Sequence, residues 1–255
     1  MKSFFFGPGK SLYGTLHEPP GAMKDVAVLL CCPGPQEYHM THWAFRRLAS
    51  QLARAGLPCL RFDWSSTGDS AGASHEARLE QWQKDLAAAA AELKDVTGLR
   101  KLAVVGLRLG AAVAVRAVSA GLKASHLVLW EPVVNGRRYL KQLEELDERE
   151  ALRLLHRVSE PRTELGGYVV TTPQRAELQA LDLTPDVPRN AQQVLLLCGP
   201  AQEAEVRALQ QAWSVGTVEV VREQGSVTDT VDRDAAVTYT AMLQVMTERL
   251  SGARP

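Results

Sequence analysis

The sequence predicts a doubly wound α/β domain built around a mostly parallel sheet. Short runs rich in valine and leucine alternate with longer segments of helical periodicity, the order expected when helices connect parallel strands. The runs are apolar at consecutive positions, which is typical of strands covered on both faces. At residues 101–122 a strand pattern passes through the turn Gly-x-Arg-x-Gly directly into an alanine-rich helix pattern.

The composition fits one globular domain. A chain of 255 residues with 45% hydrophobic and 23% charged residues can bury a sizeable core. The 29 basic and 29 acidic residues give no net charge, so we expect no nucleic-acid partner. The four cysteines lie in or beside apolar runs and predict buried free thiols. With no signal peptide and no stretch of membrane-spanning length, we expect a cytoplasmic protein.

In the first half of the chain, each element follows from a local pattern. Residues 2–6 and 11–17 alternate on either side of Gly-Pro-Gly, which predicts a hairpin. Further strands are expected at 25–32, 57–62, 102–105 and 126–130. Helices are expected from Trp43 to Ala53, over 75–96 and over 111–122, with a loop from Pro33 to His42.

The alternation stops between residues 135 and 190. A charged helix with a leucine stripe is expected over 138–158 and a second helix over 173–181. We interpret 135–190 as a small helical cap inserted between two parts of the core, 1–134 and 191–255. The second part is expected to hold strands at 194–198 and 217–221 and helices at 201–213 and 233–250.

Four segments carry a resemblance to a known superfamily. They are Leu29–His42, Leu60–Gly72, the turn around Arg108 and Leu127–Gly136. On these segments the chain resembles the α/β-hydrolases, most closely the bacterial serine-aminopeptidase-like hydrolases found with exosortase systems and with polyketide or peptide biosynthesis clusters. The resemblance covers 25–136 well and the rest in outline. It implies an α/β-hydrolase fold with a mostly parallel sheet and a cap, but no particular reaction.

The catalytic residues implied by this resemblance are largely missing. The family pattern Gly-x-Ser-x-Gly places the nucleophilic serine where this chain has Arg108. The acid that follows the strand at 194–198 could be Glu203, and no histidine follows His156. The segment Gly225-Ser-Val-Thr-Asp-Thr stands where the family histidine is expected. Arginine stays protonated and cannot attack a carbonyl, so a Ser-His-Asp mechanism is excluded.

Arg108 allows two interpretations. The N-terminus of the following helix presents unpaired N–H groups and a positive dipole end. Together with Arg108 it could hold a carboxylate or phosphate of a ligand. Alternatively, Arg108 pairs with an internal carboxylate such as Glu131 and fills the space of the missing nucleophile.

Other side chains are expected close to this turn. Glu37, Tyr38, His39 and His42 precede the first helix, and Glu131 directly follows a strand. Such groups can perform acid–base chemistry near neutral pH, or they can cap a helix and form a structural ion pair. The candidate catalytic set is Arg108, His42, Glu131 and Glu37. The candidate substrate-binding set is Tyr38, Leu107, Leu109, Pro33, Gly34, Tyr139 and Tyr168.

Three further residues are assigned without catalysis. Asp63 and Asp69 lie in a glycine-punctuated loop and are expected to bind backbone amides and hold the loop. Cys32 could be a nucleophile only with a lowered pKa and a partner base such as His42. An inert buried thiol is the expected state.

Three functions stay open at this point. The first is a non-canonical enzyme of acyl or natural-product metabolism that performs cyclisation, elimination or isomerisation. The second is an inactive pseudo-hydrolase that binds a ligand or acts as a scaffold. The third is an ester or thioester hydrolase that uses water activated by His42 or Glu131. No cofactor or metal is implied, the partner is a small acyl or carboxylate ligand, and a homodimer stays open.

Overall fold

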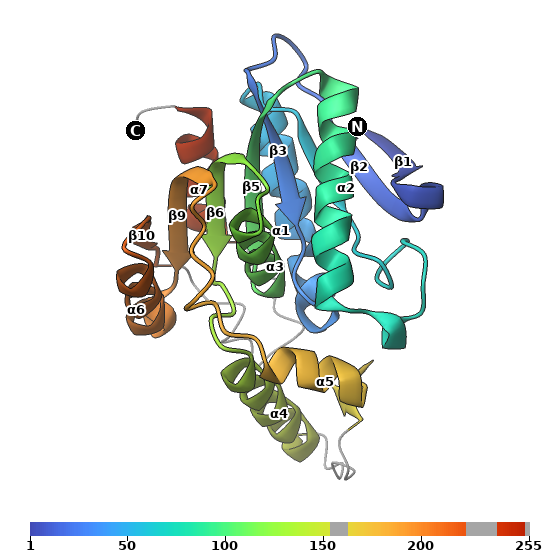
Figure 1. Ribbon diagram of the computed structural model, residues 1–255, viewed down its shortest axis with the longest axis vertical. Helices are drawn as coiled ribbons and strands as arrows, with labels where there is room; N and C mark the ends of the chain where they lie inside the picture. The colour runs from blue at the N-terminus through green and yellow to red at the C-terminus, as the bar shows by residue number, and fades with distance from the viewer. Residues whose placement is uncertain (154–162, 223–238, 253–255) are drawn as a thin grey trace.

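The computed structural model describes residues 1–153, 163–222 and 239–252. Helices cover both faces of a central sheet, and two further helices lie beyond the carboxyl ends of its parallel strands (Figure 1). The predicted α/β class is therefore confirmed.

In the described part of the chain, eight strands form one sheet in the order β1-β2-β4-β3-β5-β6-β9-β10. The strands are β1 (Lys2–Phe6), β2 (Leu12–His17), β3 (Val26–Cys31), β4 (Cys59–Phe62), β5 (Lys101–Leu107), β6 (Ala124–Trp130), β9 (Ala191–Cys198) and β10 (Thr217–Val220). β2 runs antiparallel to β1 and to β4, and all other neighbouring pairs are parallel. The predicted hairpin is thus confirmed as β1 and β2.

The described helices fall into three groups, one on each face of the sheet and one beyond the carboxyl ends of its parallel strands. They are α1 (Pro35–Arg54), α2 (Leu79–Thr97), α3 (Leu109–Ser119), α4 (Gly136–Arg153), α5 (Thr172–Gln179), α6 (Glu203–Trp213) and α7 (Thr240–Ser251). α2, α3 and α6 bury apolar side chains on one face of the sheet, and α1 and α7 do so on the other. Because both faces are covered, β3 is buried at every residue, as its unbroken apolar sequence predicted.

One prediction in this half of the molecule was wrong. The segment from Pro33 to His42 was predicted as a loop. From Pro35 onward it forms the first two turns of α1. Proline is favoured at the first position of a helix because its φ is already helical and no N–H is lost. Gly34 precedes it with extended backbone as the N-cap. The change matters for the site, because it places the side chains of residues 37–42 on different faces of a helix.

Between β6 and β9 the chain leaves the sheet. α4 and α5 pack on each other, and the short hairpin of β7 (Glu164–Leu165) and β8 (Tyr168–Val169) lies between them in sequence. Both predicted helices of this region are present, α4 as far as residue 153. The remainder of the predicted helix 138–158, residues 223–238 and the start of the predicted helix 233–250 lie outside the described residues.

Candidate functional site

The turn between β5 and α3 is held in a strained conformation. Arg108 has φ 53° and ψ −118°, a region that residues with a side chain rarely adopt. Its N–H donates to the carbonyl of Trp130, and its own carbonyl accepts from Ala111, Ala112 and Val133. These bonds fix the turn from both sides.

The two glycines of the turn are required by close packing. A Cβ atom at Gly106 would lie 2.5 Å from the Cα of Ala111. A Cβ at Gly110 would lie 2.2 Å from the carbonyl oxygen of Cys32. Since these neighbours are backbone atoms, β5, α3 and the end of β3 can approach this closely only with glycine at both positions.

The guanidinium of Arg108 is enclosed by acceptors from three parts of the chain. Its Nε donates to Glu37 Oε1 at 2.9 Å, from the first turn of α1. Nη1 donates to the carbonyl of Glu131 at 3.4 Å, and Nη2 donates to Gln142 Oε1 of α4 at 3.3 Å. Arg108 is only 2% exposed. It therefore forms a buried ion pair with Glu37, whereas the sequence interpretation named Glu131 as the example partner.

Tyr139 of α4 completes this network. Its hydroxyl donates to Glu37 Oε2 at 3.0 Å, and its ring lies 5.3 Å from the guanidinium carbon of Arg108. Burial alone would lower the pKa of Arg108, but Glu37, Tyr139 and Glu131 together outweigh it, and the pKa is raised. Burial and the neighbouring Glu37 raise the pKa of Tyr139 well above its usual value. Arg108 and Tyr139 therefore keep their protons at physiological pH.

Little space remains beside Arg108. A cavity of about 10 Å³ touches Arg108, Gln142 and Gln202, about the volume that one water molecule needs. Gln202 is 6% exposed, and its Oε1 has no hydrogen-bond partner among the residues that the structure describes. Glu131 is 2% exposed and adopts a positive φ of 43°. A ligand larger than water does not fit between these groups in this conformation.

The structure does not bring His42 and Tyr38 to Arg108. The Tyr38 hydroxyl donates to Asp63 Oδ1 at 2.7 Å, and the ring of His42 lies 5.8 Å from that of Tyr38. Burial and then the charge of Arg61 lower the pKa of His42. His39 is exposed. Of the four polar side chains of α1 that were predicted near the turn, only Glu37 reaches it, because the others point away around the helix.

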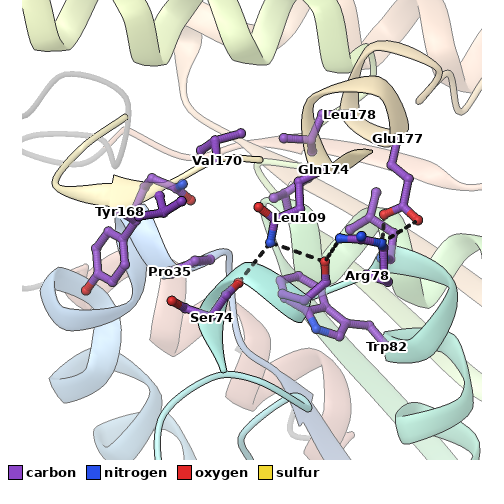
Figure 2. A pocket seen from close by; sticks show the side chains of 14 residues that line it. Pro35, Ser74, Arg78, Trp82, Leu109, Tyr168, Val170, Gln174, Glu177 and Leu178 are labelled. Carbon is purple, nitrogen blue, oxygen red and sulfur yellow. Dashed lines mark hydrogen bonds and ion pairs between the residues drawn. The ribbon is translucent and has the colours of Figure 1, made fainter. Parts of the chain in front are cut away.

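An apolar pocket opens beside Leu109, the residue that follows Arg108 in the sequence (Figure 2). Its volume is about 50 Å³. Its lining comes from α1, from the start of α3, from the segment around α2 and from the β8–α5 region. It includes Pro35, Ala77, Leu79, Trp82, Leu109, Tyr168, Val170 and Leu178. Polar groups bound it on one side: Gln174 Nε2 donates to the carbonyl of Ser74 at 2.8 Å, and Arg78 lies 3.9 Å from Glu177.

The other predicted site residues have different surroundings. Leu107 is fully buried in the core beneath α1 and α7, away from this pocket. Pro33 is buried, and a Cβ added at Gly34 would lie 2.9 Å from Leu109 Cδ1. Glu203 forms an ion pair with Arg207 along the surface of α6.

The structure agrees with the roles predicted for Asp63 and for Cys32. Asp63 Oδ2 accepts the backbone N–H of Asp69 at 3.0 Å, so Asp63 holds its loop as predicted, while the Asp69 side chain is exposed. All four cysteines are buried and free. Burial raises the pKa of Cys32, which favours the unreactive thiol.

Sequence reasoning missed several residues of this region. Gln142 and Gln202 border Arg108, and Trp82 lines the pocket. Glutamine carries no charge and fits no catalytic pattern, so nothing local marked these positions. Trp82 falls on the apolar side of α2, but that pattern equally predicts ordinary core packing.

The described residues show neither a metal-binding cluster nor a membrane-spanning helix. No group of three or more His, Cys, Asp or Glu side chains is arranged to hold a metal ion there. Within the same residues, every helix is too short or too polar to cross a membrane.

Comparisons with known proteins agree with this fold. A family model described as serine aminopeptidase, S33, matches residues 24–184. XC6422 from Xanthomonas campestris, described as an a/b serine hydrolase without lid, is 18% identical with a TM-score of 0.59, over 100% of this chain and 96% of that one. Mouse alpha/beta hydrolase domain-containing protein 10 is 16% identical with a TM-score of 0.66, over 100% of both chains.

Est1E from Butyrivibrio proteoclasticus, solved with bound ferulic acid, gives 16% identity and a TM-score of 0.64 over 94% of this chain and 93% of that one. At such identities the likeness establishes the fold alone. No curated protein matches the chain.

Proposed function

Because the chain belongs to the serine aminopeptidase S33 family of α/β-hydrolases, we propose that it is a member in which Arg108 replaces the nucleophilic serine. On this proposal the protein binds a small acyl ligand beside Leu109 and does not hydrolyse it through an acyl-enzyme. It is thus a pseudo-hydrolase with a ligand-binding role.

One observation carries the proposal: other residues of the chain surround the side chain of Arg108 at the tip of the turn and leave it 2% exposed. Each guanidinium nitrogen of Arg108 donates a hydrogen bond to Glu37, Glu131 or Gln142. A buried cation with an acceptor at each of its nitrogens stabilises the arrangement of α1, α3 and α4. With its charge balanced by Glu37, Arg108 has little attraction left for a ligand carboxylate.

The other parts of a hydrolytic mechanism are not assembled around Arg108. His42 lies with Tyr38 on another face of α1, and Glu203 is bound to Arg207 at the surface. The sequence holds no histidine after His156. Water-based hydrolysis through His42 therefore finds no support.

The pocket beside Leu109 limits the size and the polarity of the proposed ligand. An engineered cavity of ~150 Å³ holds benzene, so about 50 Å³ admits by proportion about two carbon atoms. Its walls are mainly apolar, with Trp82 on one side and Leu178 on the other (Figure 2). The buried part of the ligand is therefore a short uncharged acyl group. On this proposal residues 135–190 act as the cap, since Tyr168, Val170 and Leu178 come from that segment.

Two measurements on the purified protein test the proposal. Nitrophenyl esters and thioesters from acetyl to octanoyl are followed for release of product, and acetamide, propionamide, hexanamide and acetate are tested by ligand-observed NMR. We expect no release above that with heat-denatured protein, saturable binding of the short amides and weaker binding of acetate.

A pair of alanine variants locates the binding. Ala77→Leu fills the pocket and should weaken amide binding by about tenfold or more. Ala73→Leu makes the same change at an exposed alanine and should leave binding unchanged. Turnover that is abolished by Glu131→Gln would overturn the non-hydrolytic assignment. Absence of amide binding, or equal effects of both alanine variants, would overturn the pocket assignment.

A further inference from the structure

A second arginine near α1 lacks the partners that Arg108 has. Arg61 lies on β4, two residues after Cys59, so both side chains point to the face of the sheet that α1 covers. Cys59 packs in the core under α1, whereas Arg61 is only partly buried. It therefore lies near the edge of the helix, towards β2.

The hydrogen bonding of Arg61 is incomplete. Its Nε donates to Nε2 of His17 on β2 at 3.2 Å. Within residues 1–153, 163–222 and 239–252, no carboxylate lies within ion-pair distance of Arg61, and its Nη1 and Nη2 have no hydrogen-bond partner. Neither atom is sealed from solvent. The terminal nitrogens of Arg61 are therefore free to donate hydrogen bonds to a ligand.

The surroundings of Arg61 are positively charged. Burial, then Arg61, the N-terminal amine and Arg46 lower the pKa of His17 to about 4. Burial and the charges of Arg61 and Arg46 also lower the pKa of His42. Arg46 follows His42 by one turn of α1 and is exposed, with its guanidinium 5.2 Å from the ring of Trp43.

One carboxylate, Asp63, acts on His42 in the opposite direction, but it is already engaged. Its two oxygens accept the Tyr38 hydroxyl and the backbone N–H of Asp69. Asp63 therefore forms no hydrogen bond with Arg61.

We propose that Arg61 and Arg46, with His42 beside them, form a binding site for a phosphate group on the face of the sheet that α1 covers. The free terminal nitrogens of Arg61 can donate two parallel hydrogen bonds to phosphate oxygens, a geometry that arginine favours. Arg46 supplies a second positive charge and His42 a further donor. Two cations suit a doubly charged phosphate better than a singly charged carboxylate.

This site is separate from Arg108 and from the apolar pocket. Glu37 and Tyr38 are neighbours on α1, yet the first contacts Arg108 and the second contacts Asp63. The helix therefore lies between the two regions, and phosphate binding does not depend on the function proposed for the pocket.

Calorimetric titration of the intact protein tests the site, with inorganic phosphate, methyl phosphate and acetate as probes at fixed ionic strength. We expect phosphate to bind and acetate to bind at least about tenfold more weakly. Arg61→Gln should weaken phosphate binding by about tenfold or more, and Arg46→Gln by several-fold. Arg47→Gln removes an exposed arginine of the same helix and should change nothing.

The two probes separate the sources of the phosphate group. Tighter binding of methyl phosphate than of inorganic phosphate identifies a phosphomonoester ligand, and the reverse identifies free phosphate; either result supports the site. Phosphate binding that is unchanged in both Arg61→Gln and Arg46→Gln overturns it. So does an equal loss in Arg47→Gln, because that would show attraction by overall charge alone.

Discussion

Two arginines beside the same helix show how partners decide the role of a charge. Arg108 is 2% exposed, donates to Glu37, Glu131 and Gln142, and has its charge balanced by a carboxylate 2.9 Å away. Arg61 is partly buried and donates one hydrogen bond, to a neutral imidazole nitrogen. Both follow from the position of α1, whose first turns contribute Glu37 on one side and Tyr38 on the other.

The difference separates a structural charge from a charge that can serve a ligand. The network around Arg108 ties α1, the β5–α3 turn and α4 together, and a ligand would have to break it. Around Arg61 the described residues offer one acceptor, His17, because Asp63 is held by Tyr38 and by its own loop. Changing each arginine should therefore have opposite consequences for stability and for binding.

The largest effect is expected from Arg108→Met. The substitution leaves the Glu37 carboxylate buried without its counter-charge, which costs about 3–5 kcal/mol in the free energy of unfolding. Urea denaturation followed by circular dichroism measures this. Arg47→Met, at an exposed arginine of α1, is the control and should stay within about 0.5 kcal/mol.

The double variant Arg108→Met with Glu37→Met sharpens the result. It removes both charges and should be more stable than Arg108→Met alone, since no unpaired carboxylate remains buried. If Arg108→Met unfolds at the same urea concentration as Arg47→Met, the network is not a structural element and the comparison fails.

A smaller effect is expected from the protonation of His17. Its pKa is about 4 in the folded protein and 6.5 as a free side chain, so the folded state binds fewer protons between these values. The stability that depends on neutral His17 is present above about pH 6.5 and is lost as the pH falls towards about 4, by at most about 3 kcal/mol. Denaturation at pH 7 and pH 4.5 should show a smaller difference for His17→Gln than for the unmodified protein. An identical pH dependence in both proteins would exclude His17 as the titrating group.

The smallest change in stability is expected from Arg61→Gln, within about 0.5 kcal/mol. The same substitution should raise the pKa of His17 and of His42, because the charge of Arg61 lowers both. NMR titration of the imidazole resonances in Arg61→Gln and in Arg47→Gln checks this. Unshifted imidazole pKa values in Arg61→Gln would show that Arg61 does not set the local charge.

Much of the fold could be predicted from local sequence patterns. The unbroken apolar run of β3 and the glycines around Arg108 predicted a buried strand and a tight turn, and both are present. These signals are local, since burial on both faces and close backbone approach restrict the residue type at each position. The start of α1 was missed because the glycine- and proline-rich segment before it is typical of loops.

The site could be predicted only in part. The sequence by itself determined that a permanently charged arginine stands at the centre of the turn Gly-x-Arg-x-Gly, and that no histidine follows His156. Only the tertiary structure decided that Glu37 pairs with Arg108 and that Tyr38 binds Asp63 instead. Partners 71 and 25 residues apart in sequence are chosen by the rotation of one helix against the sheet. That rotation depends on packing across the whole core, so no local pattern encodes it.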